Sequence, residues 1–389
     1  MKMRKILQAN RWLLLGMLLL ICILSGLSAM ANGVTEGLYS QQQAIRWKNG
    51  EDPYAQVSAF FEKEKGAGTD FISSVRGNML SKLSEDGFLN SETSKKTWLD
   101  AYSGERQLSI KRKETSMSVT AVGVGGDFFQ FHPIPLKSGS YLTSADINGD
   151  RVVIDEQVAW NFFGSNDVVG MNIQIGDRIY NIAGVTDIPE DTLYENTYGE
   201  YSRIYLNFDE LKIIDEQAAI TCYEAVLPNP ITNYAYGVIS QACGVSSDST
   251  EGKKDSIFFF GDCEIVENSS RFGIAAMYGL FKTSKYRSAK TNGVVYPFWE
   301  NIARIKEEKV MHIRCIQVFL LLCLAILLVV VLIRARRVIG PVSFEPVKKI
   351  LKQIPKPAIK KRKRKTDPEE EIVGEDDDDE EDNHEVLHN

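Results

Sequence analysis

Residues 125–164 read GGDFFQFHPIPLKSGSYLTSADINGDRVVIDEQVAWNFFG, and this stretch carries most of the information about the fold. An aromatic run follows the opening glycines, and a Pro-containing segment leads from it to a loop of Asn, Gly and Asp. The β-branched residues Val152, Val153 and Ile154 then predict a strand. Residues 156–163 predict a short Phe-containing helix that ends at a glycine. Three interpretations are open: a metal site, a cofactor-binding helix, or a structural element of a larger domain.

The acidic loop at residues 146–150, DINGD, begins like the calcium-binding loop of an EF-hand. That loop needs a glycine at its sixth position for a sharp turn and a bidentate glutamate at its twelfth. Arg151 and Gln157 stand at these two positions. We therefore interpret the loop as a polar turn before a strand, and we expect no metal there.

Sequence motifs for catalysis are absent from the chain. His132 is the one histidine within residues 32–310, the extracytoplasmic domain predicted below, and its neighbours in FHPIP favour a packed residue. The sequence contains no His-Glu-x-x-His, no Gly-x-Ser-x-Gly and no Gly-x-x-x-x-Gly-Lys-Ser/Thr. We expect no enzyme activity and no cofactor, and a glycosidase-type carboxylate pair has no support. Core packing is the simplest interpretation of Phe128, Phe129, Phe131, Phe162 and Phe163.

Two uncharged stretches, Trp12–Ala31 and Ile316–Ile333, approach the roughly 20 apolar residues that a transmembrane helix needs. Because Lys and Arg flank their outer ends, we predict cytoplasmic termini and an extracytoplasmic middle, in a two-pass protein of the cell membrane. The basic residues are Lys2, Arg4, Lys5, Arg11, Arg334, Arg336 and Arg337. The predicted division is a cytoplasmic N-terminus (1–11), a first transmembrane helix (12–31), an extracytoplasmic domain with stalk helices (32–310), a second transmembrane helix (314–334) and a charged cytoplasmic tail (335–389).

The first apolar stretch also fits a cleaved secretory signal, with a basic start and Ala29-Met30-Ala31 as the cleavage site. Either interpretation leaves the middle of the chain outside. Cys222, Cys243 and Cys263 lie in that middle part and show no metal-type spacing. One disulfide with a leftover thiol and three free thiols both fit this odd number.

The tail contains a basic block at 356–365, KPAIKKRKRK, and an acidic block at 367–382. Blocks of like charge repel one another, so the tail is predicted to be disordered. The basic block either attracts anionic lipid beside the membrane or only sets the topology. The net charge of -7 gives no reason to expect a nucleic acid as a partner.

The extracytoplasmic part mixes helices and strands without regular alternation, which favours an α+β domain of two subdomains. Helices are expected at 36–50, 54–66 and 69–87, each ended by glycine. Alternating apolar residues predict strands, and the expected hairpins and strands lie at 106–124, 171–185 (turning at Gly176-Asp177), 151–156, 202–208, 222–230 and 261–268.

The end of the domain, VVYPFWENIARIKEEKVMHIRC (294–315), predicts a helix that continues into the second apolar stretch. Pro297 fits the first helical turn, and nothing after it breaks a helix. Trp299, Ile302 and Ile305 are its candidate stalk residues, and the charged segment 304–309 is expected to meet water. The segment 36–50 is its expected companion. Because a rigid helix transmits a displacement, a flexible insertion near Ile305 is predicted to abolish function.

Residues 128–185 resemble the periplasmic core domain of the MacB/FtsX-type ABC transporter permeases. A Phe-rich segment leads to a Pro-Leu-x-x-Gly turn, and then a strand, an Ala/Phe helix ending in Phe-Gly, a Val-Gly-x-x-Ile segment and a strand closing on Gly-Val follow in order. The residues that carry this signature are Phe128, Phe129, Pro135, Gly139, Ala159, Phe163, Gly164, Gly170 and Gly184.

The resemblance implies an α+β MacB-like core between two transmembrane helices, with structural and no catalytic roles for these residues. It also implies retention of the first helix, and work beside a partner ABC ATPase and a full permease subunit. Permeases of this family have four spans, and this chain shows a truncated, two-span version, so transport through this subunit alone is not expected.

Two functions follow from these observations. In the first, the chain is a permease-like subunit whose outer domain couples ATPase-driven motion to export or to regulation of an envelope protein. In the second, it is a stand-alone, membrane-anchored binding or sensor module.

Overall fold

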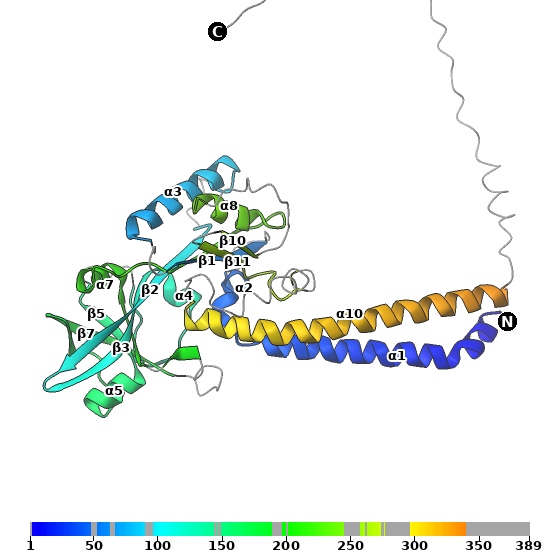
Figure 1. Ribbon diagram of the computed structural model, residues 1–389, viewed down its shortest axis with the longest axis horizontal. Coiled ribbons are helices and arrows are strands. Elements are labelled where there is room, and N and C mark those ends of the chain that lie inside the picture. The colour runs from blue at the N-terminus through cyan, green and yellow to red at the C-terminus, as the bar shows by residue number, and fades with distance from the viewer. Residues whose placement is uncertain are drawn as a thin grey trace, which may run out of the picture.

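The computed structural model describes residues 2–47, 53–62, 67–89, 96–143, 146, 149–188, 197–199, 201–244, 257–260, 263–273, 276 and 296–339. A sheet-rich domain lies at one end of two long helices (Figure 1). The tail predicted to be disordered lies outside the described residues from residue 340 onward.

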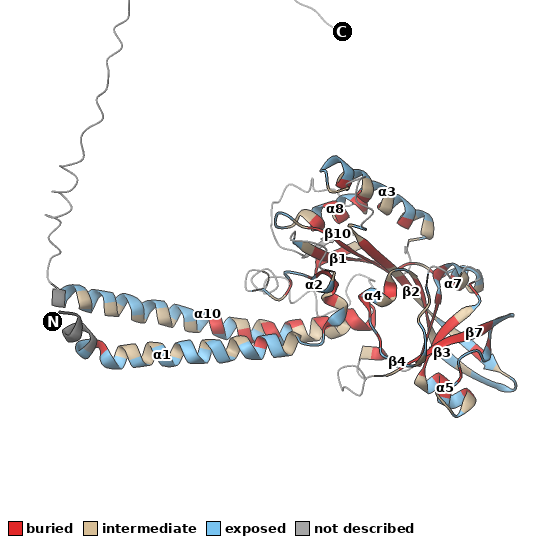
Figure 2. Ribbon diagram, turned by 180° about the vertical axis from the view of Figure 1, so that it is seen from behind, coloured by how far each residue is buried: buried red, intermediate tan, exposed pale blue. Residues whose placement is uncertain are grey.

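The two long helices are α1 (Lys2–Thr35) and α10 (Phe298–Ile339), which lie side by side with opposite chain directions (Figure 1). Within them, Gln8–Thr35 and Phe298–Arg337 are long and apolar enough to cross a membrane. Their outward faces beyond the domain are exposed in Figure 2. Two apolar helices therefore flank the domain.

The expected unbroken helix after Pro297 is confirmed by α10. Its companion is α1 itself, since Ala31 of α1 packs against Val310 and Ile313 of α10. Farther along the pair, Gln317 of α10 donates a hydrogen bond from Nε2 to Ser28 Oγ of α1 at 2.9 Å. A polar bond of this kind fixes the register of two apolar helices.

Two helix predictions at the start of the domain are wrong. Residues 36–50 form only the short helices η1 (Tyr39–Gln41) and α2 (Gln43–Arg46) within their described part. The segment expected as a helix at 54–66 contains strand β1 (Tyr54–Phe61), in which every residue after Tyr54 is buried. Ala55, Val57 and Ala59 alternate with Gln56 and Ser58, a period-two pattern that predicts a strand. Both faces can be buried because Gln56 and Ser58 form hydrogen bonds.

The described strands form an 11-stranded sheet in the order β10-β11-β1-β9-β2-β3-β8-β5-β7-β4, and β6 pairs with both β2 and β7. The other strands are β2 (Leu99–Arg112), β3 (Thr115–Gly126), β4 (Leu136–Gly139), β5 (Arg151–Asp155), β6 (Asn172–Ile175), β7 (Arg178–Thr186), β8 (Arg203–Asn207), β9 (Cys222–Pro228), β10 (Ile257–Phe260) and β11 (Cys263–Glu267). The hairpins and strands expected from alternation are confirmed.

Six of these strands close into a small barrel. The pairings run from β2 through β3, β8, β5, β7 and β6 back to β2. Apolar side chains such as Val119, Val152, Ile154 and Ile204 fill it. Helices α5 (Glu156–Phe163) and α7 (Phe208–Ile214) contribute to the same core. The barrel forms the part of the domain farthest from the free ends of the long helices (Figure 1).

Strands β10, β11, β1 and β9 form an open sheet that shares β2 and β3 with the barrel, whereas β4 pairs with β7 of the barrel. Helices α3 (Thr69–Glu85), which confirms the helix expected at 69–87, and α8 (Tyr234–Ala242) cover one face. The short helix α4 (Phe128–Phe131), α2 and the first turns of α10 pack against the other face. Figure 1 shows α10 reaching the domain there, close to α4.

Two glycines mark the place where the shared strands pass from the open sheet into the barrel. Gly104 of β2 pairs with Gly123 of β3. A Cβ atom on Gly104 would lie 2.0 Å from the carbonyl oxygen of Ala219, and one on Gly123 would lie 2.7 Å from the side chain of Leu211. Glycine is therefore required here by close approach of the neighbouring chain.

Candidate functional site

The signature residues of the sequence divide between two cores and several turns. Phe128 and Phe129 belong to the cluster that packs against α10, whereas Ala159 and Phe163 belong to the barrel. Gly139, Gly164 and Gly170 have positive φ angles of 78°, 67° and 81°. Pro135 is exposed, and Gly184 is buried against the backbone of Ser140. The structure therefore does not bring these residues together into one site.

The junction between α10 and the sheet is the candidate functional site, because it joins a membrane-type helix to the domain. Trp299 is 3% exposed and lies among the aromatic residues of α4 and α10. Its ring centroid is 4.0 Å from that of His132, 5.6 Å from Phe128 and 5.1 Å from Phe298. Of the other candidate stalk residues, Ile302 packs against this cluster and Ile305 is half-buried.

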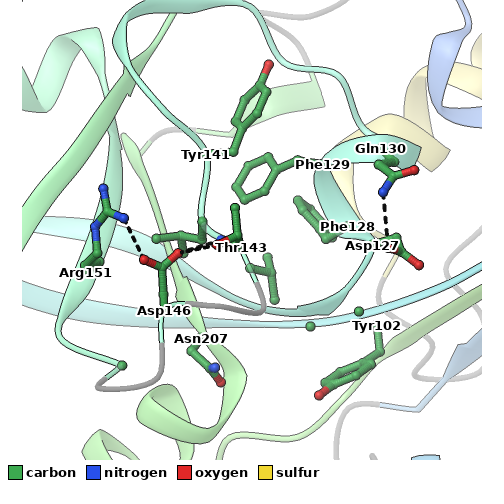
Figure 3. Close-up of a pocket in the computed structure, with 15 residues that line it drawn as sticks. Tyr102, Asp127, Phe128, Phe129, Gln130, Tyr141, Thr143, Asp146, Arg151 and Asn207 are labelled. Carbon is green, nitrogen blue, oxygen red and sulfur yellow. Dashed lines mark hydrogen bonds and ion pairs between the residues drawn. The ribbon is translucent and has the colours of Figure 1, made fainter.

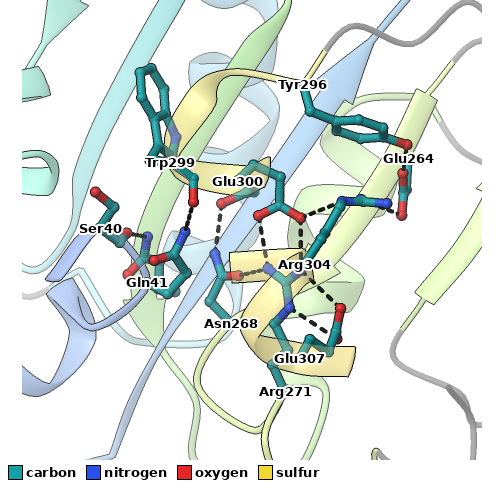
Figure 4. A network of polar contacts seen from close by, with 12 residues as sticks. Ser40, Gln41, Glu264, Asn268, Arg271, Tyr296, Trp299, Glu300, Arg304 and Glu307 are labelled. Carbon is teal, nitrogen blue, oxygen red and sulfur yellow. Dashed lines mark hydrogen bonds and ion pairs between the residues drawn. The ribbon is translucent and has the colours of Figure 1, made fainter. Parts of the chain in front are cut away.

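Below this aromatic cluster, Arg271 connects the turn after β11 to two positions on α10 that are about two helical turns apart (Figure 4). Its guanidinium donates two hydrogen bonds of 2.8 Å to the Glu300 carboxylate, and bonds of 3.0 and 3.1 Å to Glu307. Arg304 bonds Glu300 and Glu264 of β11, each at 2.8 Å. We call Arg271, Glu300, Arg304, Glu307 and Glu264 the junction ion cluster.

The junction ion cluster is buried, and each of its charged groups forms an ion pair with one of opposite charge. The Arg271 side chain has 0% exposure, and the Glu300 and Glu264 side chains are equally enclosed. Burial alone would lower the pKa of Arg271, but Glu300 and Glu307 outweigh it and hold that pKa above its ordinary value. Removal of one partner from such a cluster leaves a buried charge uncompensated, which is strongly destabilising.

A continuous series of hydrogen bonds leads from the ion cluster across the sheet to α4. Asn268 accepts from Arg271 at 3.3 Å and donates to Ser58 Oγ at 2.7 Å. Ser58 donates to Glu224 Oε1 at 2.9 Å, and Glu224 Oε2 lies 2.6 Å from Nε2 of His132. His132 is thus a packed and hydrogen-bonded residue, as its sequence context indicates. Helix α10, strands β1 and β9, and α4 are connected through polar as well as apolar contacts.

The expectation that segment 304–309 meets water is only partly right. Arg304 and Glu307 turn inward into the ion cluster, while Glu308 and Lys309 are exposed. Glu300, Arg304 and Glu307 recur at helical spacing, which places them on one face of α10. That periodicity is the one signal in the sequence that could have predicted a buried ionic face. Arg271 carries no such signal, because its partners lie about 30 residues away.

A pocket of about 550 Å³ opens beside α4, where the carboxyl ends of the parallel strands β3 and β8 meet (Figure 3). The rings of Phe129 and Tyr141 form one wall, stacked at 4.6 Å. Asp146 lies on the opposite side and accepts hydrogen bonds from Arg151 at 2.6 Å and from the Thr143 backbone at 2.6 Å. Asp146 is thus engaged with Arg151, the residue that stands where a calcium loop has glycine. This supports a polar turn.

Among the described residues, no group of three or more His, Cys, Asp or Glu side chains could hold a metal ion. The junction and the pocket present ion pairs and hydrogen bonds between protein groups, while His132 Nδ1, Trp299 Nε1 and Arg304 Nη1 are buried without a hydrogen-bond partner among the described residues. Their arrangement can join elements mechanically and accept a ligand of small-molecule size.

The MacB-like periplasmic core domain matches residues 13–230 of this chain. Similar solved structures include the periplasmic region of MacB from Actinobacillus actinomycetemcomitans, with 16% identity, a TM-score of 0.37, and coverage of 55% of this chain and 89% of that one. Others are the extracellular domain of the noncanonic ABC-type transporter YknZ from Gram-positive bacteria (13%, 0.33, 49% and 96%) and a domain of a putative permease from Porphyromonas gingivalis (10%, 0.31, 56% and 92%). No curated protein matches the chain.

The family match extends over more than half of the chain's 389 residues, and it includes the first apolar helix, the open sheet through β9 and the barrel. The described architecture, a mixed α/β domain between two apolar helices, is the one that the sequence signature implied. The chain belongs to the family of the MacB-like periplasmic core domain, within the MacB/FtsX-type ABC transporter permeases.

Proposed function

We propose that this chain is a permease-like membrane subunit that works beside an ABC ATPase and a full permease, with its sheet domain outside the cell membrane and both termini inside. Its role is to pass ATP-driven motion to the outer domain, which then serves export or regulates an envelope protein. The observation that supports this most directly is the junction ion cluster, because it holds α10 to the sheet through bonds on two helical turns.

A rigid connection of this kind has a mechanical consequence. Helix α10 runs without interruption from Phe298 to Ile339, so a tilt or shift at its membrane end displaces its first turn as well. The buried ion pairs and Trp299 bind that first turn to α4, β1 and β11. Movement of the helix therefore moves the sheet domain, where a flexible linker would absorb it.

The second candidate is a stand-alone, membrane-anchored binding or sensor module. The pocket of about 550 Å³ beside α4 supports it, because that volume suits a small ligand. The two candidate functions differ in the expected partners: the first requires an ABC ATPase and a full permease in the membrane, and the second requires neither.

Purification decides between them. The full chain would be isolated in mild detergent from membranes of its own source, and its stoichiometric partners identified by mass spectrometry. We expect an ABC-type ATPase and a four-span permease in fixed ratio to the chain. A chain that purifies alone at native expression, with neither partner recovered after cross-linking in intact cells, would favour the sensor module.

Mechanical coupling is tested by a pair of insertions after Met311, on the membrane side of the ion cluster. An insertion at Ile305 would lie between Arg304 and Glu307 and would disturb folding. Gly-Ser-Gly-Ser interrupts the helix, whereas Ala-Ala-Ala-Ala shifts the chain equally and preserves helicity. We expect the alanine variant to keep more of the complex's nucleotide-dependent activity. Equal activity of the two variants, at equal expression and partner binding, would show that helix rigidity is not required.

A further inference from the structure

Two of the three cysteines in the domain lie on the same face of the open sheet. Cys263 of β11 pairs with Phe61 of β1, so both side chains point to the face covered by α3 and α8. Cys243 follows Ile239 by one helical turn at the end of α8, and Ile239 is fully buried against that face. Both cysteines pack against the same apolar cluster, and α8 contacts β11 directly.

The third cysteine is separated from this pair by the sheet. Cys222 of β9 pairs with Phe60 of β1, and both belong to the cluster on the opposite face, around α10. Adjacent strand residues point to opposite faces, so Cys222 cannot reach either of the other two thiols without breaking the sheet. The odd number of cysteines is thereby divided into a pair and a single buried thiol.

We propose that Cys243 and Cys263 form a disulfide bond in the mature protein. The inference rests on the extracytoplasmic placement in the proposed function, because disulfides persist in oxidising compartments. The oxidant is an organic or protein disulfide. The two cysteines lose their S–H bonds, a Sγ–Sγ bond forms between them, and the two electrons and two protons pass to the oxidant, which becomes two thiols.

The bond would connect the end of α8 to β11, the strand next to the edge strand β10, and would link the two ends of the segment 244–262 that contains β10. Burial raises the pKa of Cys243 to about 12, and it raises the pKa of Cys263 as well. Few thiolates are therefore present in the folded, reduced protein at neutral pH, and thiolate is the reactive form. The bond is accordingly a structural one that forms during folding, and it does not act as a rapid redox switch.

Thiol counting on the full chain tests the pairing. Cells are acid-quenched, and the denatured protein is treated with a polyethylene glycol maleimide before and after reduction. All six cysteines should react after reduction, and four of them should react before it. Cys243→Ser and Cys263→Ser should each show five reactive thiols in both conditions. Cys222→Ser, the matched control, should show three before reduction and five after.

Peptide mapping and a topology control complete the test. Digestion without reductant should yield a joined peptide that contains Cys243 and Cys263. Six free thiols before reduction, in a domain that an impermeant reagent reaches from outside, would overturn the disulfide and leave the proposed function standing. A domain found inside the cell would overturn both. Purified protein treated with oxidised glutathione during refolding should form the same bond, and failure there would show that the thiols are out of reach.

Discussion

Arg271 is the residue on which the junction depends most. It is fully buried, it lies in a turn of the sheet domain, and it bonds two carboxylates of α10. A lysine could not make the same contacts, because the planar guanidinium uses all three nitrogen atoms, and its Nη2 donates to both Glu300 and Glu307. Arg271 therefore contributes both to the folding of the sheet domain and to the attachment of α10.

We expect Arg271→Met to lower the free energy of unfolding by roughly 3–5 kcal/mol, because Glu300 and Glu307 lose their buried partner. Lys82→Met is the matched control, since Lys82 pairs with Asp86 on the surface of α3 and such pairs contribute about 0–1 kcal/mol. Urea denaturation of the full chain in detergent measures both. Similar midpoints for the two variants would contradict a stabilising role of the ion cluster.

Asp155 predicts a pH dependence of stability. It is fully buried at the start of α5 and accepts hydrogen bonds from the backbone N–H groups of Val158 at 2.9 Å and Arg203 at 2.6 Å. Burial raises its pKa to about 6, although these hydrogen bonds oppose the shift. Because this pKa exceeds that of the unfolded chain, near 3.8, the folded state binds the proton more tightly. This contribution to stability is present below about pH 4 and disappears as the pH rises through about 6.

Asp155→Asn removes this titration and keeps a side chain that can cap the helix. Between pH 4 and pH 7, the stability difference between parent and variant should change by about 2–3 kcal/mol in favour of the variant. Urea midpoints at the two pH values measure it, and the comparison cancels the other titrating groups. A difference that stays constant with pH would mean that Asp155 titrates alike in both states.

At the scale of elements, the long strands β2 and β3 determine the architecture. Their 14 and 12 residues serve the open sheet at one end and the barrel at the other. The change of partner takes place near the paired glycines Gly104 and Gly123, where α7 and the chain around Ala219 approach closely. Both parts of the domain therefore depend on the absence of side chains at this crossing.

Two glycine substitutions should have opposite effects. Gly104→Ala places a Cβ atom 2.0 Å from the backbone oxygen of Ala219. We expect this overpacking to lower the free energy of unfolding by roughly 1–3 kcal/mol. Gly77→Ala in α3 meets no atom within 4 Å, and alanine should stabilise the helix by about 0.5–1 kcal/mol. Denaturant midpoints of the two variants provide the measurement. A neutral Gly104→Ala would show that the two chains can separate there.

At the scale of the whole molecule, apolar and polar surfaces are segregated along the long axis. The exposed leucines, isoleucines and aromatic residues of α1 and α10 lie on the part of the helix pair that extends away from the domain (Figure 2). The junction ion cluster lies at the domain end of α10, where it is surrounded by protein groups. The molecule thus has one part suited to lipid and one suited to water.

Cysteine labelling tests the topology in intact cells. In a chain whose own cysteines are replaced by serine, Ile231→Cys places a thiol at a position that is 68% exposed on the domain. An impermeant maleimide should label it without permeabilisation, because basic residues flank the outer ends of both apolar stretches. Ser343→Cys, beyond the second stretch, should react only after permeabilisation. The reverse pattern would place the domain in the cytoplasm.

The sequence alone was sufficient for the features that local patterns encode. Alternating apolar residues predicted β2, β3, β6, β7 and β8, and an unbroken helical run predicted α10. The order of motifs in residues 128–185 predicted the family to which the chain belongs. These features depend on side-chain periodicity and turn residues within one segment, so that one sequence contains the necessary information.

Only the tertiary structure decided how distant segments meet. β1 lies between β11 and β9 with both faces buried, a position that its alternating sequence YAQVSAFF does not reveal. Arg271 forms hydrogen bonds with Glu300 and Glu307 because the turn after β11 packs beside α10. Burial on two faces and ion pairing across the fold depend on residues that are distant in the sequence. Such residues produce no pattern within a single segment.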